Sequence, residues 1–275
     1  MLTEPLSECT CGCPNSLQKE CGPRKYSLQD VNASAEINYH SSNNINDVLT
    51  KYMDTVYADR ADTAKKECQE KERTLPRRNV KKKLKVSSTG GYCSSHGTSR
   101  MGPNNRFKYN LQEFFSQEKI KSLGDFGAGE GLYGKHLVEA FNGTLEYRGY
   151  DGAGDVETAT NGFLKFFDLV LPLHLPMNDW VMSIEVGEHI PHSHEAMYIR
   201  NLHAHNCKGI VLSWAKTGQG GVHHINCHDK PYLLDIFQPL GYVLDVDATA
   251  KLTEKVEYDF LRKNVMVLRR TQPIC

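Results

Sequence analysis

The stretch Lys121–Leu132, KSLGDFGAGEGL, decides the fold of this chain of 275 residues. A short apolar segment ends at an acidic residue and runs into a turn that holds Gly127, Gly129 and Gly131. Glycines at such a place let the backbone turn tightly and approach a ligand closely. An amphipathic helix is expected to follow over residues 132–141. Strand, glycine turn and helix in this order are typical of the first unit of a ligand-binding α/β sheet.

Strands and helices are expected to alternate through the rest of the chain. The further expected strands cover residues 145–150, 163–167, 180–184, 209–214, 242–246 and 264–268. Helices are expected over residues 195–206 and 232–240. With the strand over 121–126, this alternation predicts an α/β fold with a doubly wound, mostly parallel, seven-stranded sheet. Open sheets of this kind bind ligands outside the carboxyl ends of their strands, where we therefore expect the site residues.

Acidic residues stand at the ends of the first three expected strands, namely Asp125, Asp151 and Asp168. Together with the glycine turn, this pattern resembles class I S-adenosylmethionine-dependent methyltransferases, with a Rossmann-like domain over residues 90–275. The resemblance implies that Asp125 and the turn hold the methionine end of the cofactor, Asp151 the ribose hydroxyls and Asp168 the adenine amino group. The cofactor-binding residues that it implies are Asp125, Gly127, Ala128, Gly129, Gly131, Asp151 and Asp168.

A dinucleotide-binding domain stays open as an alternative. Gly129, Gly131 and Gly134 can be fitted to the G-x-G-x-x-G pattern, and a single glycine turn is a weak signal.

Two carboxylates and an imidazole follow the strand over 180–184, in the order Glu185, Glu188 and His189. The loop after the next strand carries His223 and His224, and it is expected to meet the first group because the two strands are neighbours. Carboxylate oxygens and imidazole nitrogens together suit Mg²⁺, Mn²⁺, Fe²⁺ or Zn²⁺.

The E-x-x-E-H string also resembles the metal-binding segment of small-RNA 2′-O-methyltransferases and ubiquinone-pathway O-methyltransferases. That resemblance implies Glu185, Glu188 and His189, together with His223 or else His224, as ligands of Mg²⁺ or Mn²⁺, and His223 is taken as the expected fourth ligand. Glu185, Glu188, His189 and His224 are the expected catalytic residues, facing the methyl acceptor. A metal-free pocket, in which a histidine acts as a general base, is the simpler interpretation and stays open.

The first 89 residues are expected to form a low-complexity tail with one helix over 46–73 and a basic linker over 76–85. The basic residues of 77–85 leave a nuclear location open. Four cysteines, Cys9, Cys11, Cys13 and Cys21, are too closely spaced for an ordinary zinc site, and we expect reduced thiols there. Cys93 is expected to line the pocket or to be a free surface thiol.

The whole chain has 33 basic and 33 acidic residues, which argues against a dedicated nucleic-acid-binding protein. No apolar run is long enough to span a membrane, and no signal peptide pattern opens the sequence, so an intracellular, cytoplasmic location is expected. The histidines at 203 and 205 are expected to be solvated on a helix surface and are given no role. Nothing in the sequence predicts an oligomeric state.

These observations predict an enzyme that transfers the methyl group of S-adenosylmethionine to an oxygen or nitrogen atom. The part of the chain after residue 100 is acidic, so a small molecule is favoured over RNA as the acceptor. The segments Gly90–Cys93 and Asp179–Asn226 resemble animal "methyltransferase-like" proteins most closely. A non-catalytic cofactor-binding module that acts through its N-terminal tail is the alternative, followed by an NAD-dependent oxidoreductase.

Overall fold

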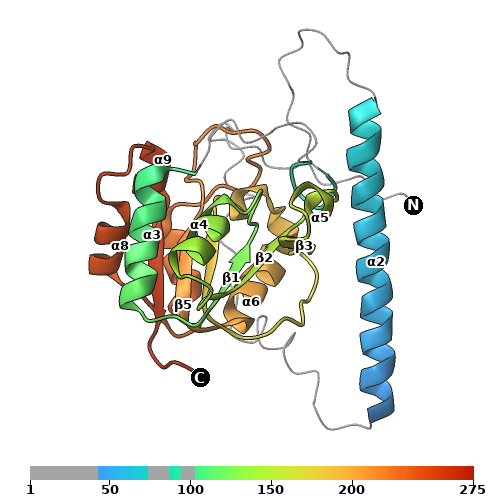
Figure 1. Ribbon diagram of the computed structural model, residues 1–275, viewed down its shortest axis with the longest axis horizontal. Helices are drawn as coiled ribbons and strands as arrows, with labels where there is room; N and C mark the ends of the chain where they lie inside the picture. The colour runs from blue at the N-terminus through green and yellow to red at the C-terminus, as the bar shows by residue number, and fades with distance from the viewer. Residues whose placement is uncertain (1–42, 74–86, 94–102) are drawn as a thin grey trace.

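The computed structural model describes residues 43–73, 87–93 and 103–275 (Figure 1). The basic run over 77–85 and the four clustered cysteines lie outside the described residues, so the predictions about them remain predictions. In the described part of the chain, no helix is long and apolar enough to cross a membrane.

A seven-stranded sheet in the order β3-β2-β1-β4-β5-β7-β6 forms the centre of the fold. Its strands are β1 (Ser122–Phe126), β2 (Glu146–Asp151), β3 (Leu164–Phe166), β4 (Asn178–Ile184), β5 (Asn206–Ser213), β6 (Tyr242–Leu244) and β7 (Met266–Arg270). The strands from β3 to β5 are parallel, and β7 is antiparallel to both of its neighbours. The predicted seven-stranded, mostly parallel Rossmann-like sheet is confirmed. The chain order reverses between β1 and β4, which is where such sheets bind ligands.

Helices cover both faces of this sheet. They are α3 (Asn105–Gln117), α4 (Leu132–Ala140), α5 (Val156–Ala159), α6 (Glu195–Ala204), α7 (Lys230–Phe237), α8 (Val246–Thr253) and α9 (Asp259–Asn264). The strand expected to reach residue 246 ends at Leu244, because Asp245 caps α8 by accepting a hydrogen bond from the amide of Ala248.

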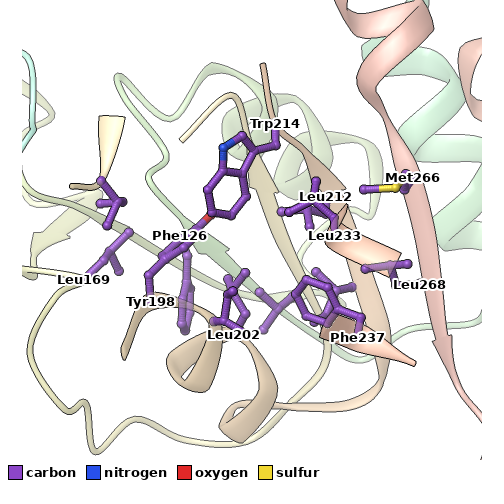
Figure 2. Close-up of a cluster of buried hydrophobic side chains, with 14 of the residues drawn as sticks. Phe126, Leu169, Tyr198, Leu202, Leu212, Trp214, Leu233, Phe237, Met266 and Leu268 are labelled. Atoms are coloured by element: carbon purple, nitrogen blue, oxygen red, sulfur yellow. The ribbon is translucent and has the colours of Figure 1, made fainter. Parts of the chain in front are cut away.

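Alternate strand residues point to opposite faces of the sheet and build two apolar cores. On one face, Val181, Leu212 and Leu268 pack with Tyr198 of α6 and Phe237 of α7 (Figure 2). On the other face, Trp180, Met182, Val211 and Val267 pack against α3, α4, α8 and α9. One of the two histidines expected to be solvated, His205, is buried instead, because its Nδ1 and Nε2 atoms bond the backbone of Asn201 and Leu175.

A long helix, α2 (Asn43–Arg73), lies along the side of the domain next to α5 and β3 (Figure 1). It includes the predicted helix over 46–73. The exposed turns of α2 are polar, and its inward face carries Tyr57, Arg60, Ala64 and Cys68 at helical spacing. Gly154 permits this contact, since a Cβ atom there would stand 2.1 Å from the backbone of Ala64.

A disulfide joins Cys68 of α2 to Cys93, with their Cα atoms 5.4 Å apart. Cys93 is completely buried, so the expectation of a free surface thiol or a pocket-lining thiol is wrong. A second disulfide joins Cys207 to Cys275. The segment 87–93 also bonds to the loop after β2, because the Thr89 hydroxyl donates to the carbonyl of Gly152 at 2.5 Å.

Candidate functional site

A cavity of about 360 Å³ opens at the carboxyl ends of β1, β2 and β4. Its volume lies within the roughly 300–1,000 Å³ that is typical of small-molecule pockets. The glycine turn after β1 and the segment 87–93 form part of its wall. Four carboxylates line it, from Asp125, Glu130, Asp151 and Glu185, and no lysine or arginine of the described residues does.

The glycine turn brings the end of β1 against the end of β2. Gly127 has a φ of 82°, and a Cβ atom there would stand 2.4 Å from Cγ2 of Val186, so a larger residue does not fit. The amides of Gly127 and Ala128 both donate to the carbonyl of Tyr150, at 2.8 and 2.9 Å. The predicted cofactor residues Gly127, Ala128 and Gly129 all line the cavity, whereas Gly131 begins α4 as its N-cap.

Two buried carboxylates stand beside this turn. Asp125 accepts a hydrogen bond from the Tyr147 hydroxyl at 2.7 Å, and burial raises the pKa of Asp125 to about 7. Asp151 accepts from the amides of Gly129 (2.7 Å) and Ala153 (2.8 Å), and burial raises the pKa of Asp151 to about 6. Both residues line the cavity, where their remaining lone pairs are available to hydroxyl or ammonium groups of a ligand.

Asp168 is placed differently from the other two. It is completely buried, and its carboxylate binds the guanidinium of Arg60 from α2 at 2.8 to 2.9 Å. Asp168 is not among the residues that line the cavity, although its neighbour Leu169 is. The predicted contact of Asp168 with adenine therefore stays a prediction. In the structure the carboxylate of Asp168 binds Arg60 of α2 instead.

Glu185 and Glu188 follow β4. Glu185 has a φ of 55°, a strained conformation for a residue with a side chain, and such strain gathers at functional sites. Glu188 lies in the short 3₁₀ helix Gly187–His189 and is completely buried. Neither of its carboxylate oxygens has a hydrogen-bond partner among the described residues. Burial, and then the charge of Glu185, raise the pKa of Glu188 well above its ordinary value.

Two imidazoles near this carboxylate each bond a backbone carbonyl through Nδ1. Nδ1 of His189 lies 3.0 Å from the carbonyl oxygen of His223, and Nδ1 of His224 lies 3.1 Å from that of Gln219. A carbonyl oxygen only accepts, so each Nδ1 carries a proton. Burial lowers the pKa of His189 to about 4, so this ring is neutral at pH 7.

The structure brings Glu188, His189 and His224 together. One ligand atom from each of the three lies within 4.8 Å of the other two. Glu185 lines the cavity and accepts from the side-chain amide of Gln219 at 3.3 Å. Of the two loop histidines, His224 joins the group of three, while His223 contributes its backbone carbonyl to His189.

Sequence reasoning missed Tyr92, which lines the cavity. Its hydroxyl donates to the carbonyl of Val222 at 2.5 Å and lies 3.2 Å from Nδ1 of His189. Tyr92 thus joins the segment 87–93 to both halves of the candidate site. No local pattern signals this role, because Tyr92 and His189 are 97 residues apart in the chain.

No family model matches the chain, and no curated protein matches it in sequence. Solved structures that resemble it include magnesium protoporphyrin IX methyltransferase from Synechocystis PCC 6803 with bound SAH, at a TM-score of 0.45 and 14% identity, covering 60% of this chain and 82% of that one. N-methyltransferase NodS from Bradyrhizobium japonicum WM9 in complex with SAH has a TM-score of 0.47 and 11% identity, over 65% and 93% of the two chains. Human N-acetylserotonin methyltransferase in complex with SAM has a TM-score of 0.43 and 13% identity, over 60% and 51%.

These likenesses concern the arrangement of strands and helices alone. The resemblance to animal methyltransferase-like proteins stays a prediction.

Proposed function

We propose that the protein transfers the methyl group of S-adenosylmethionine to an oxygen or nitrogen atom of a small acceptor, with a divalent cation beside the acceptor. The observation that carries this proposal is the buried carboxylate of Glu188, whose oxygens have no hydrogen-bond partner among the described residues and lie near one ring nitrogen each of His189 and His224. A buried carboxylate without a partner is costly, and a bound cation would supply the missing partner.

The cofactor would lie in the cavity at the ends of β1 and β2. The glycine turn admits a ligand close to the backbone, Asp151 is placed to accept from ribose hydroxyls, and Asp125 to accept from an ammonium group. These residues bind and orient. Methyl transfer needs an in-line approach of the acceptor to the sulfonium, so positioning supplies much of the rate.

The cation would be held by Glu188, His189 and His224, with Glu185 next to them. Such a mixed oxygen and nitrogen set suits Mn²⁺ or Mg²⁺. When bound, the cation supplies a Lewis acid that lowers the pKa of an acceptor hydroxyl. The backbone carbonyls of His223 and Gln219 fix the tautomer of the two imidazoles, as partners of metal-binding histidines commonly do.

A small acceptor is favoured over RNA by the charge of the cavity wall. Its four carboxylates would repel a phosphate backbone, and RNA binding relies on lysine and arginine.

The cellular compartment of the protein is inferred from its cysteines. Disulfides such as Cys68–Cys93 persist in oxidising surroundings, which favours an oxidising compartment over the cytoplasmic location expected from the sequence.

Calorimetric titration of S-adenosylmethionine into the full chain, in EDTA and then in Mn²⁺, tests this function. We expect binding by the wild type, loss of binding in Asp151→Asn, and unchanged binding in the matched variant Asp235→Asn, whose side chain is exposed on α7. Binding of NAD in place of S-adenosylmethionine would overturn the proposal in favour of an oxidoreductase. Tight cofactor binding without transfer to any of a panel of hydroxyl and amine acceptors would favour a non-catalytic module.

A further inference from the structure

A second cluster of imidazoles around a carboxylate lies beside the candidate site. Glu195, the first residue of α6, is completely buried. Its Oε2 atom lies 2.7 Å from Nε2 of His228, in the loop after β5, and 3.3 Å from Nδ1 of His192, in the turn before α6. One ligand atom from each of these three residues lies within 4.8 Å of the other two.

The carboxylate of Glu195 is held in place by two further side chains. The Tyr232 hydroxyl donates to Oε1 at 2.6 Å, and the Asn226 amide donates to Oε2 at 2.8 Å. The ring of His228 stacks on that of Tyr232, with centroids 3.8 Å apart and planes 13° apart. Ligands of metal sites are commonly oriented by such surrounding hydrogen bonds and packing.

We propose that His192, Glu195 and His228 bind a zinc ion at a site separate from that of Glu188. Two imidazole nitrogens and one carboxylate oxygen are a common zinc ligand set, with a fourth position left for water. Water can reach the cluster from the side of His192, because 46% of the His192 side chain is exposed.

The spacing of the cluster is close to what zinc requires. Ligand bonds of about 2.0–2.1 Å at tetrahedral angles place neighbouring ligand atoms about 3.3 Å apart. The distance from Nδ1 of His192 to Oε2 of Glu195, 3.3 Å, equals this value. Nε2 of His228 lies 2.7 Å from the same oxygen and would have to move away by about 0.6 Å. One ring nitrogen of His192 lies within 4.8 Å of one of His228, so these two would have to approach each other on binding.

The ion would join two segments that belong to the candidate site. His192 follows closely on His189, whereas His228 ends the loop that carries His223 and His224. The same loop is fixed to the first segment by the amides of Ile225 and Asn226, which donate to the carbonyl of Glu188 at 2.9 and 3.1 Å. Zinc at this place would hold the loop against the turn after β4, and this role does not depend on the proposed methyl transfer.

The test is a titration of the full chain, freed of metal with EDTA, with Co²⁺ as a visible stand-in for Zn²⁺, followed by displacement with Zn²⁺. Co²⁺ bound by imidazoles and a carboxylate absorbs in the visible range. Co²⁺ bound by cysteine thiolates shows additional near-ultraviolet bands, so the spectrum distinguishes the two kinds of site. We expect His192→Gln and His228→Gln each to weaken the same binding step at least tenfold. The matched variant His194→Gln, an exposed neighbour, should titrate as the wild type does.

Glu188→Gln separates this proposal from the proposed function, because it should leave the absorption of the second site intact while removing any effect of Mn²⁺ at the first. Unchanged titrations in both His192→Gln and His228→Gln would overturn the proposal, and so would a wild type without Co²⁺ absorption of the imidazole type. Either result would show that hydrogen bonds alone hold the cluster together and that it binds no metal. Melting followed by circular dichroism in EDTA checks folding. If His228→Gln unfolds, the exposed residue His192 decides the result.

Discussion

At the scale of single residues, the environment of Glu188 makes the clearest demand on the chemistry of the site. A carboxylate that is fully buried, close to a second carboxylate and without a hydrogen-bond partner among the described residues is costly in its charged form. Burial, and then the charge of Glu185, raise the pKa of Glu188, so a cation that binds there would compete with a proton.

Replacing this carboxylate by an amide should separate folding from cation binding. We expect Glu188→Gln to keep or raise the melting temperature in EDTA, because the variant no longer buries an ionisable group without a partner. Saturating Mn²⁺ should raise the melting temperature of the wild type and leave that of the variant unchanged. The measurement is thermal unfolding with and without Mn²⁺. A Mn²⁺-dependent rise of equal size in the variant would contradict the assignment.

The pKa values of Asp125 and Asp151 predict how stability depends on pH. Both are raised, to about 7 and about 6, while the unfolded chain ionises near pH 4. Between these values Asp125 and Asp151 bind more protons in the folded chain than in the unfolded chain, so the contribution of these two groups to the free energy of unfolding falls as pH rises from about 4 to about 7. In Asp125→Asn the free energy of unfolding should fall less steeply with pH, because one of the two groups no longer titrates.

Urea unfolding in EDTA at stepped pH measures this slope, with Asp235→Asn as the control because its side chain is exposed. Equal slopes in the wild type and in Asp125→Asn would refute the raised pKa.

At the scale of elements, α2 is the part of the structure that sequence reasoning interpreted least well. Its periodic apolar residues predict a helix, which is confirmed. The contacts that fix α2 to the domain are made by Arg60, Ala64 and Cys68, which fall in or beside its polar half. A polar helix surface is ordinarily solvated, so only the three-dimensional position of Asp168 and Cys93 reveals these contacts.

The disulfide between α2 and residue 93 should stabilise the position of the helix. A disulfide that closes a loop of 25 residues lowers the conformational entropy of the unfolded chain, which stabilises the folded chain by about 3 kcal/mol. Cys68→Ser should lower the free energy of unfolding by about this amount and should speed tryptic cleavage within α2. Cys275→Ser, which removes the disulfide to Cys207, should leave the cleavage rate of α2 unchanged. Equal cleavage rates in the wild type and in Cys68→Ser would mean that α2 is held by its other contacts.

The glycine against which α2 packs gives a second test of the same element. A methyl group on Gly154 would meet the Ala64 backbone at 2.1 Å, so Gly154→Ala should cost about 1–3 kcal/mol of stability. A Cβ atom at Gly220 has open space, and Gly220→Ala should change stability little. Chemical unfolding measures the free energy of unfolding of both variants. Equal values for Gly154→Ala and Gly220→Ala would argue against close packing of α2 on the domain.

At the scale of the whole molecule, the seven-stranded, mostly parallel sheet and the edge that carries the cavity were predictable from the sequence, whereas the segments that close the cavity were not. The glycine turn and the acids after β1 and β2 are local patterns, and they do line one cavity. The partners of those residues come from distant segments, as with Tyr92 and His189. The helices α3, α8 and α9 were not predicted either, because their short apolar stripes are hard to distinguish from loops.

The disulfides Cys68–Cys93 and Cys207–Cys275 predict how the described part of the chain matures. Peptide mapping of the unreduced protein should find Cys68 linked to Cys93 and Cys207 linked to Cys275. Protein made in an oxidising compartment in which these four thiols are all open to alkylation would contradict both pairings.

The contacts around the cavity also bear on the order of folding. Tyr92 meets Val222 across 130 residues, and Arg60 meets Asp168 across 108. Contacts between such distant residues carry a large loop-closure entropy and form late, after the sheet has nucleated. Interactions absent from the transition state act mainly on the unfolding rate. The wall of the cavity should therefore assemble last and open first, and substitutions there should speed unfolding while leaving the folding rate almost untouched.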